Sequence, residues 1–227
     1  MSIATTREAA LSAPDTFLSS LTKREARTIS RLTSPAKIQS FLDSLPYSDE
    51  TRYRSPLSVL RDGKGHCFDG ALFAAAMLRR ISYPPLIIDM IPNDNDDDHL
   101  LAVFKAHGHW GSVAKSNYSG LRFREPVYRS LRELVMSYFE DFFNAIGEKT
   151  LRGFTRPLNL KEFDRLHWMT SDEHLDAIAD RLDEIKRYKV VSTSMIRRLS
   201  FADHRSVAAG LLGAKKSGLF KPRKRRS

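Results

Sequence analysis

Residues 67–78 are the part of the sequence that most constrains the fold. They read Cys-Phe-Asp-Gly-Ala-Leu-Phe-Ala-Ala-Ala-Met-Leu, which is rich in helix-forming residues and apolar on nearly every face. A helix of this kind is stable only when other elements surround it. Tyr83-Pro84-Pro85 ends the pattern because proline cannot continue a helix. The sequence therefore predicts a buried helix that begins at Cys67.

The segments after this helix predict a small antiparallel sheet. Residues 86–91, 99–104 and 110–114 are short apolar runs joined by turns, a pattern typical of strands in a meander. Pro92 to Asp98 forms the first turn, and His107-Gly108 forms the second.

Helices are expected both before and after the strand segments along the chain. Residues 16–44 read as helical, with a break near Thr33-Ser34-Pro35. Helical spacing of apolar residues predicts a long helix opened by Glu125-Pro126 and ending near Gly147, with its aromatic stripe in the core. Thr170-x-x-Glu173 matches a capping box that starts another helix. The fold class is therefore α+β, a buried cysteine helix on a small antiparallel sheet with additional C-terminal helices.

Charge and composition suggest three parts in the chain. We expect a flexible leader over 1–15, one domain over 16–202 with a helical extension after about 125, and a disordered basic tail over 203–227. Residues 205–227 hold eight of the 37 Lys and Arg and no acidic residue, so the rest of the chain is nearly neutral. The tail could bind nucleic acid or an anionic surface, or it could simply be solvated.

The composition also excludes several classes of protein. One cysteine permits no internal disulfide and no zinc site with two cysteine ligands. The sequence has neither 18 consecutive apolar residues nor a secretory leader, so we expect a cytoplasmic protein that does not insert into membranes.

Cys67 is the candidate nucleophile. A glycine-containing loop, Gly63-Lys64-Gly65, leads to the first turn of the buried helix, where unpaired N–H groups and the helix dipole favour a thiolate and can hold an oxyanion. His99 opens a strand expected to pack on this helix and is the candidate base. The alternative is a small, inert core cysteine.

The residues around Cys67 resemble a known family. Gly65-His66-Cys67-Phe68-Asp69-Gly70-Ala71 resembles the Gly-x-Cys-x-Asp-x-Ala motif of the transglutaminase-like superfamily. Residues 55–60 and 81–85, His99 and Trp110 extend the resemblance over residues 35–118. It implies a papain-like core and a Cys-His-Asp triad that forms a thioester from an amide or ester, as in cross-linking transglutaminases, proteases and deglycosylating amidases.

The third member of that triad is missing from its usual place. The position is Ala114, followed by Lys115, and neither side chain can accept the imidazole N–H. Asn117 is our first candidate for orienting His99, by analogy with papain-like enzymes. A carboxylate of the Asp94–Asp98 turn is the second candidate, and a backbone carbonyl is also possible.

The aspartates of this turn do not match a calcium-binding loop. Counted from Asp94, the sixth and twelfth positions hold His99 and Lys105 where an EF-hand requires Gly and Glu. We interpret the cluster as a solvated turn whose charge could raise the pKa of His99. We expect no metal and no cofactor.

Two functions follow from the sequence. The first is cysteine-dependent acyl chemistry on a peptide or protein amide, or on an ester, by hydrolysis or transfer. The alternative is a binding module that keeps the fold but has lost the triad, as Ala114 suggests.

Overall fold

The computed structural model describes residues 12–222, in which one antiparallel sheet organises the chain. Its strand order is β4-β3-β2-β1-β5-β7, with β6 also paired to β1. The strands are β1 (Leu86–Ile91), β2 (His99–Ala106), β3 (His109–Val113), β4 (Arg124–Tyr128), β5 (Gly153–Thr155), β6 (Leu158–Asn159) and β7 (Arg187–Lys189).

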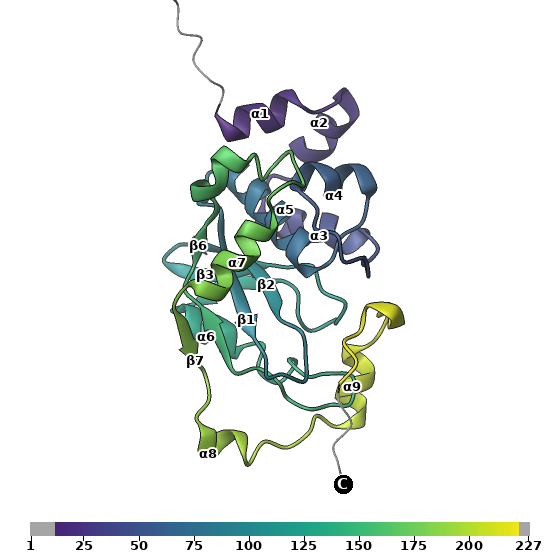
Figure 1. The fold of residues 1–227 in the computed structure, drawn as a ribbon, viewed down its shortest axis with the longest axis vertical. Coiled ribbons are helices and arrows are strands. Elements are labelled where there is room, and N and C mark those ends of the chain that lie inside the picture. The colour runs from purple at the N-terminus through teal and green to yellow at the C-terminus, as the bar shows by residue number, and fades with distance from the viewer. Residues whose placement is uncertain (1–11, 223–227) are drawn as a thin grey trace, which may run out of the picture.

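Helices cover the sheet and extend to both ends of the molecule. In Figure 1, α1 and α2 lie at one end, and α9 lies toward the other. The helices are α1 (Ala13–Ser19), α2 (Lys23–Ser30), α3 (Pro35–Ser44), α4 (Pro56–Asp62), α5 (Cys67–Arg80), α6 (Leu131–Met136), η1 (Leu160–Leu166), α7 (Asp176–Glu184), α8 (Thr193–Ile196), α9 (His204–Gly210) and η2 (Lys216–Gly218).

The central strands are apolar on both faces because both faces are covered. Ile87 of β1 and Leu100 of β2 pack with α5, whereas Ile88 and Leu101 belong to a second core around α6. Side chains alternate between the two faces of a strand, so the uninterrupted apolar runs serve two cores.

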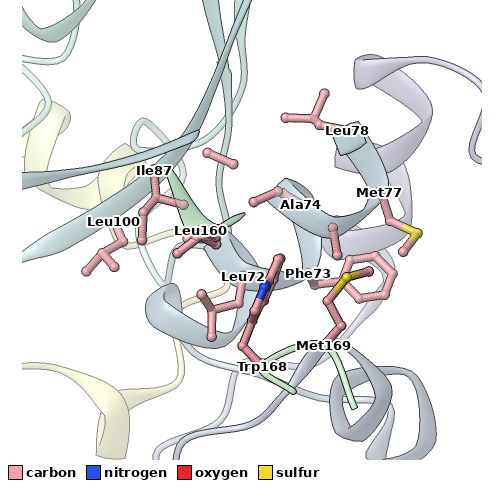
Figure 2. Close-up of a cluster of buried hydrophobic side chains, with 14 of the residues drawn as sticks. Leu72, Phe73, Ala74, Met77, Leu78, Ile87, Leu100, Leu160, Trp168 and Met169 are labelled. Atoms are coloured by element: carbon pink, nitrogen blue, oxygen red, sulfur yellow. The ribbon is translucent and has the colours of Figure 1, made fainter. Parts of the chain in front are cut away.

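Helix α5 is the centre of the larger core. It packs on β2 and contacts α3 and α4, and its side chains from Phe68 to Leu78 are buried. In Figure 2, Leu72, Phe73 and Met77 of α5 belong to one cluster that also contains Trp168 and, from β1, Ile87. The predictions of a buried cysteine helix, of an antiparallel meander and of an α+β fold are confirmed.

The prediction of one long helix over 125–147 was wrong. Glu125 and Pro126 lie in β4, which is an edge strand that tolerates a proline. Helix α6 ends at Met136, and the Tyr138 hydroxyl is then hydrogen-bonded to Ser112 of β3. The aromatic residues are nevertheless core residues, as predicted: Tyr138, Phe139, Phe142 and Phe143 are buried, but by a folded loop.

Two helix boundaries also differ from prediction. The Thr170 capping box does not form, because the Thr170 hydroxyl donates to the His167 carbonyl and α7 begins only at Asp176. Helix α1 starts at Ala13, inside the expected leader, while residues 1–11 lie outside the described residues.

Residues 203–222, which belong to the tail expected to be disordered, contain α9 and η2. Asp203 caps α9 by accepting the Arg205 and Ser206 amides, and the chain then returns toward the sheet. Residues 223–227 lie outside the described part. No helix within residues 12–222 is long and apolar enough to cross a membrane.

Gly70 sets the distance between α5 and the segment after β3. A Cβ at this position would lie 2.2 Å from the Lys115 Cβ and 3.3 Å from its Cα. We therefore expect Gly70→Ala to lower the free energy of unfolding by about 1–3 kcal/mol or more, because a main-chain segment must move. Urea unfolding measures this. Gly108→Ala is the control, since Gly108 has φ +83° but nothing within 4 Å; equal losses in both variants would contradict the steric explanation.

Candidate active site

Two backbone N–H groups donate to the Asp69 carboxylate and hold the loop that precedes Cys67. Its Oδ1 accepts the Arg54 backbone N–H at 2.8 Å, and its Oδ2 accepts the His66 N–H at 3.1 Å. The Ser48 N–H also donates to the Gly65 carbonyl at 3.0 Å. The first turn of α5 is thus held by two preceding segments as well as by its own helix.

Cys67 lies where two cavities meet. The larger is a cleft of about 520 Å³ between α5, β1 and α7, which we call the acidic cleft. The smaller, of about 50 Å³, holds both Cys67 and His99, and we call it the histidine pocket. Cys67 therefore lines both the acidic cleft and the pocket that His99 lines.

A backbone carbonyl orients His99. The ring is buried, and its Nε2 lies 2.8 Å from the Leu121 carbonyl oxygen. A carbonyl only accepts, so Nε2 carries the proton and Nδ1 is left with the free lone pair. Within the described residues no hydrogen bond joins His99 to Cys67.

Asn117 also lines the histidine pocket, but its amide is bonded elsewhere. Its Nδ2 donates to the Lys215 carbonyl at 2.9 Å, and its Oδ1 accepts the Lys215 N–H at 2.8 Å. The group that orients the His99 ring is therefore the Leu121 carbonyl and not the Asn117 side chain. The reason is that the C-terminal segment occupies both hydrogen-bonding groups of Asn117.

Residues 215–220, which we call the strap, cross the entrance to the site. Lys215 pairs with Asp49 at 2.6 Å, and Gly218 lies against Tyr47, where a Cβ would be 3.0 Å from the ring. Ser217 to Phe220 line the acidic cleft, and Gly218 and Phe220 also line the histidine pocket. The strap therefore forms part of the wall of both cavities that Cys67 lines.

The resting charges differ from those expected from the sequence. Burial, together with the charges of Asp98 and Asp97, raises the pKa of the Cys67 thiol, although the Leu100 and Phe68 amides favour the thiolate. Burial lowers the pKa of His99 to about 4, whereas we expected the aspartates to raise it. The pair at rest is therefore a neutral thiol and a neutral imidazole.

Sequence reasoning missed Tyr47, Asp89 and the strap. Tyr47 lines both cavities, and the Cys67 backbone N–H favours its ionised form although burial raises its pKa. Asp89 interrupts the apolar run of β1, which was the one available signal of a polar group in the core. Nothing in the basic composition of the tail indicated that it returns to the cysteine.

The aspartate turn is part of the site wall. Asp97 and Asp98 line both cavities, while Asp96 accepts a hydrogen bond from Thr150 at 2.5 Å. No group of three or more His, Cys, Asp or Glu side chains in residues 12–222 is arranged to hold a metal ion.

Comparison of the sequence with protein families and with curated proteins finds no match. Among solved structures, the chain is similar to LapG from Legionella pneumophila, with 17% identity over 48% of this chain and 72% of LapG and a TM-score of 0.34. The calcium-bound form gives 16% identity, coverages of 47% and 72%, and a TM-score of 0.35. This is a distant likeness of fold, and the function proposed below rests on the residues of this chain.

The carboxylates should make Cys67 slow to react, and Asp98→Asn should speed its alkylation. The pKa of Asp98 is raised to about 6 by burial and by Asp97, so at pH 8 it is ionised and opposes the thiolate. We expect iodoacetamide to react roughly three- to tenfold faster with the variant at pH 8. This is the increase in the thiolate fraction when the pKa of the thiol falls by about half a unit to one unit. The difference should shrink below pH 6, where Asp98 is protonated.

The reaction reports on one site because Cys67 is the only cysteine. Mass spectrometry gives the labelling rate, and Asp94→Asn is the control, since Asp94 is exposed and lines neither cavity. Equal rates in the wild type and Asp98→Asn would contradict the electrostatic account.

Asn117→Ala should uncover the thiol by releasing the strap. The substitution removes two hydrogen bonds to Lys215, each of which contributes about 1 kcal/mol. We expect a bulky maleimide to label Cys67 about ten times faster or more. Ser119→Ala is the control, because its hydroxyl bonds Ala209 outside the strap. An unchanged rate in Asn117→Ala would show that the strap does not limit access.

Proposed function

We propose that the protein is a cysteine-dependent hydrolase or acyltransferase that acts on peptide or protein amides through a thioester. The observation that carries this proposal is the shared pocket: Cys67 begins a buried helix, and an oriented His99 lines the same cavity. The transglutaminase-like resemblance of residues 65–71 supports the same chemistry.

The proposed reaction starts from neutral groups. His99 Nδ1, the ring nitrogen with a free lone pair, accepts the thiol proton as the sulfur attacks the substrate carbonyl. The proton then passes from His99 to the leaving amine, and a thioester remains. Water or a second amine attacks the thioester, His99 takes its proton, and the thiol is restored.

Backbone groups at the start of α5 suit the developing oxyanion. The first N–H groups of a helix have no partner inside the helix and lie at the positive end of its dipole. The Cys67 N–H lies beside Tyr47, whose hydroxyl is a second possible donor to the substrate oxygen. Leu121 keeps the imidazole in one tautomer, the task that a carboxylate performs in a triad.

The resting electrostatics favour a second candidate, an inactive binding module. The thiol pKa is raised, the pKa of His99 is about 4, and no ion pair forms between them in the described structure. Under this alternative the acidic cleft binds a ligand and Cys67 takes no part.

Turnover of a fluorogenic peptide library separates the two functions. We expect Cys67→Ala to abolish turnover and His99→Gln to lower kcat by about 10²–10⁴-fold. Because burial raises the thiol pKa, kcat/KM should keep rising with pH above 7 rather than level off below it.

An acyl-enzyme on Cys67, trapped by mass spectrometry, confirms the thioester step. Asp94→Asn is the matched control and should retain turnover, since its side chain is outside both cavities. A library that gives no turnover in wild type or Asn117→Ala, with folded protein, would instead support the binding module.

A further inference from the structure

The acidic cleft has a charge opposite to that of the chain. Among the described residues that line it, Asp49, Glu50, Asp89, Asp97, Asp98 and Asp183 are acidic, and none is Lys or Arg. The full sequence carries a net charge of +10. Clefts lined by one sign of charge raise the local concentration of the opposite charge. Asp49, Glu50 and Asp183 are already in ion pairs with Lys or Arg side chains. Among the described residues, Asp89, Asp97 and Asp98 have no such ion pair, so these three acids are available to attract a cation.

Asp89 is the buried floor of this cleft. Asp89 is 4% exposed, and its Oδ1 atom has no hydrogen-bond partner among the described residues. A buried carboxylate without a partner is costly, and such groups are normally paired. The charge of Arg187 lowers the pKa of Asp89, but the Arg187 guanidinium already binds Asp183 at 2.8 Å. Asp89 thus lines the cleft with a carboxyl group whose hydrogen-bonding capacity is not used by the described residues.

The position of Asp89 relates it directly to the thiol. Asp89 of β1 is the register partner of Leu100 in β2, and both line the acidic cleft. Paired residues of antiparallel strands point to the same face of the sheet, about 4.5–5.5 Å apart at Cα. The Leu100 amide faces the Cys67 sulfur. The Asp89 carboxyl is thus one strand away from the residue that contacts the nucleophile.

The strap forms one wall of the acidic cleft as an extended polypeptide segment. Ser217 to Phe220 line it, and Leu219 has the extended dihedrals φ −91° and ψ 135°. An extended peptide that replaced the strap would bring a main-chain carbonyl to Cys67. Lys and Arg side chains are long and flexible enough to reach a carboxyl one strand away.

We propose that Asp89 is a specificity-determining residue, which pairs with the ammonium or guanidinium group of a Lys or Arg on a peptide bound in the acidic cleft. This proposal rests on the proposed function, because that function is what places a peptide beside Cys67. Asp97 and Asp98 add negative charge at the cleft wall and attract the same side chain. The empty cleft holds an unpaired acid at Asp89, and the basic residue of the substrate supplies its partner.

Binding of labelled peptides tests the proposal without turnover. The full chain carrying Cys67→Ala is titrated at pH 7.5 with fluorescein pentapeptides that have Lys, Arg or norleucine at the centre and random residues elsewhere. The same titrations are repeated with Asn117→Ala added, which frees the strap. We expect Lys and Arg peptides to bind at least about tenfold more tightly than norleucine peptides. Asp89→Asn should remove this preference, whereas Asp94→Asn should keep it.

A second readout separates specificity from a structural role. Burial and the charge of Asp98 raise the pKa of Asp89, and Asn has nearly the shape of a protonated Asp. The variant without peptide should therefore unfold at a temperature equal to or higher than that of wild type at pH 7.5. A lower unfolding temperature would mean that Asp89 supports the fold, and it would overturn the proposal. So would a preference for basic peptides that survives Asp89→Asn, equal binding of all three peptides, or no binding in the strap-released protein.

The outcomes distinguish this proposal from the proposed function. Turnover by the unmutated protein without any preference for Lys or Arg would keep the cysteine chemistry and remove the role of Asp89. An Asp89-dependent preference in a protein that never turns over peptides would keep the role of Asp89 and remove the chemistry.

Discussion

The hydrogen bonds of Asp69 are the interaction on which the site depends. This fully buried carboxylate joins the start of α5 to the segment around Arg54, whose guanidinium is also buried and reaches Asp62 and Glu50. Removing one member of a buried pair typically costs about 3–5 kcal/mol, because the other charge is left uncompensated. The location of the thiol is thus set by a polar network inside the core and not by the cysteine's own packing.

Desolvation controls the chemistry of the two candidate groups more strongly than the helix dipole does. Cys67 lies at a helix N-terminus that would favour a thiolate in water-exposed surroundings, yet burial and the nearby aspartates act in the opposite direction. His99 is buried and has only a neutral carbonyl as its partner, so nothing stabilises its charged form. A bound cation beside Asp89 would offset part of the negative field that disfavours the thiolate, which links recognition to reactivity.

Local patterns in the sequence were sufficient to predict the buried helix and the central strands. They were not sufficient to predict which polar groups bond to one another. Helix α5 and the strands β1 to β3 follow from apolar runs bounded by turn residues, because such runs must be buried. The loop after α6 has helical spacing but is held by the tertiary bond from Tyr138 to Ser112, which no local pattern encodes. The same holds for the site: Cys67 and His99 were proposed from the sequence, but the Leu121 carbonyl and the Lys215 contact of Asn117 depend on long-range packing.

Because the strap belongs to the chain whose cleft it covers, any peptide from outside competes with an intramolecular ligand. A tethered segment acts at an effective concentration on the order of millimolar for a short flexible connection, with no new contact required. Only molecules whose strap is displaced bind the outside peptide, so the observed dissociation constant is the intrinsic constant divided by that fraction. The two hydrogen bonds between Asn117 and Lys215 therefore help to set the peptide concentration needed to displace the strap from the wall of the cleft.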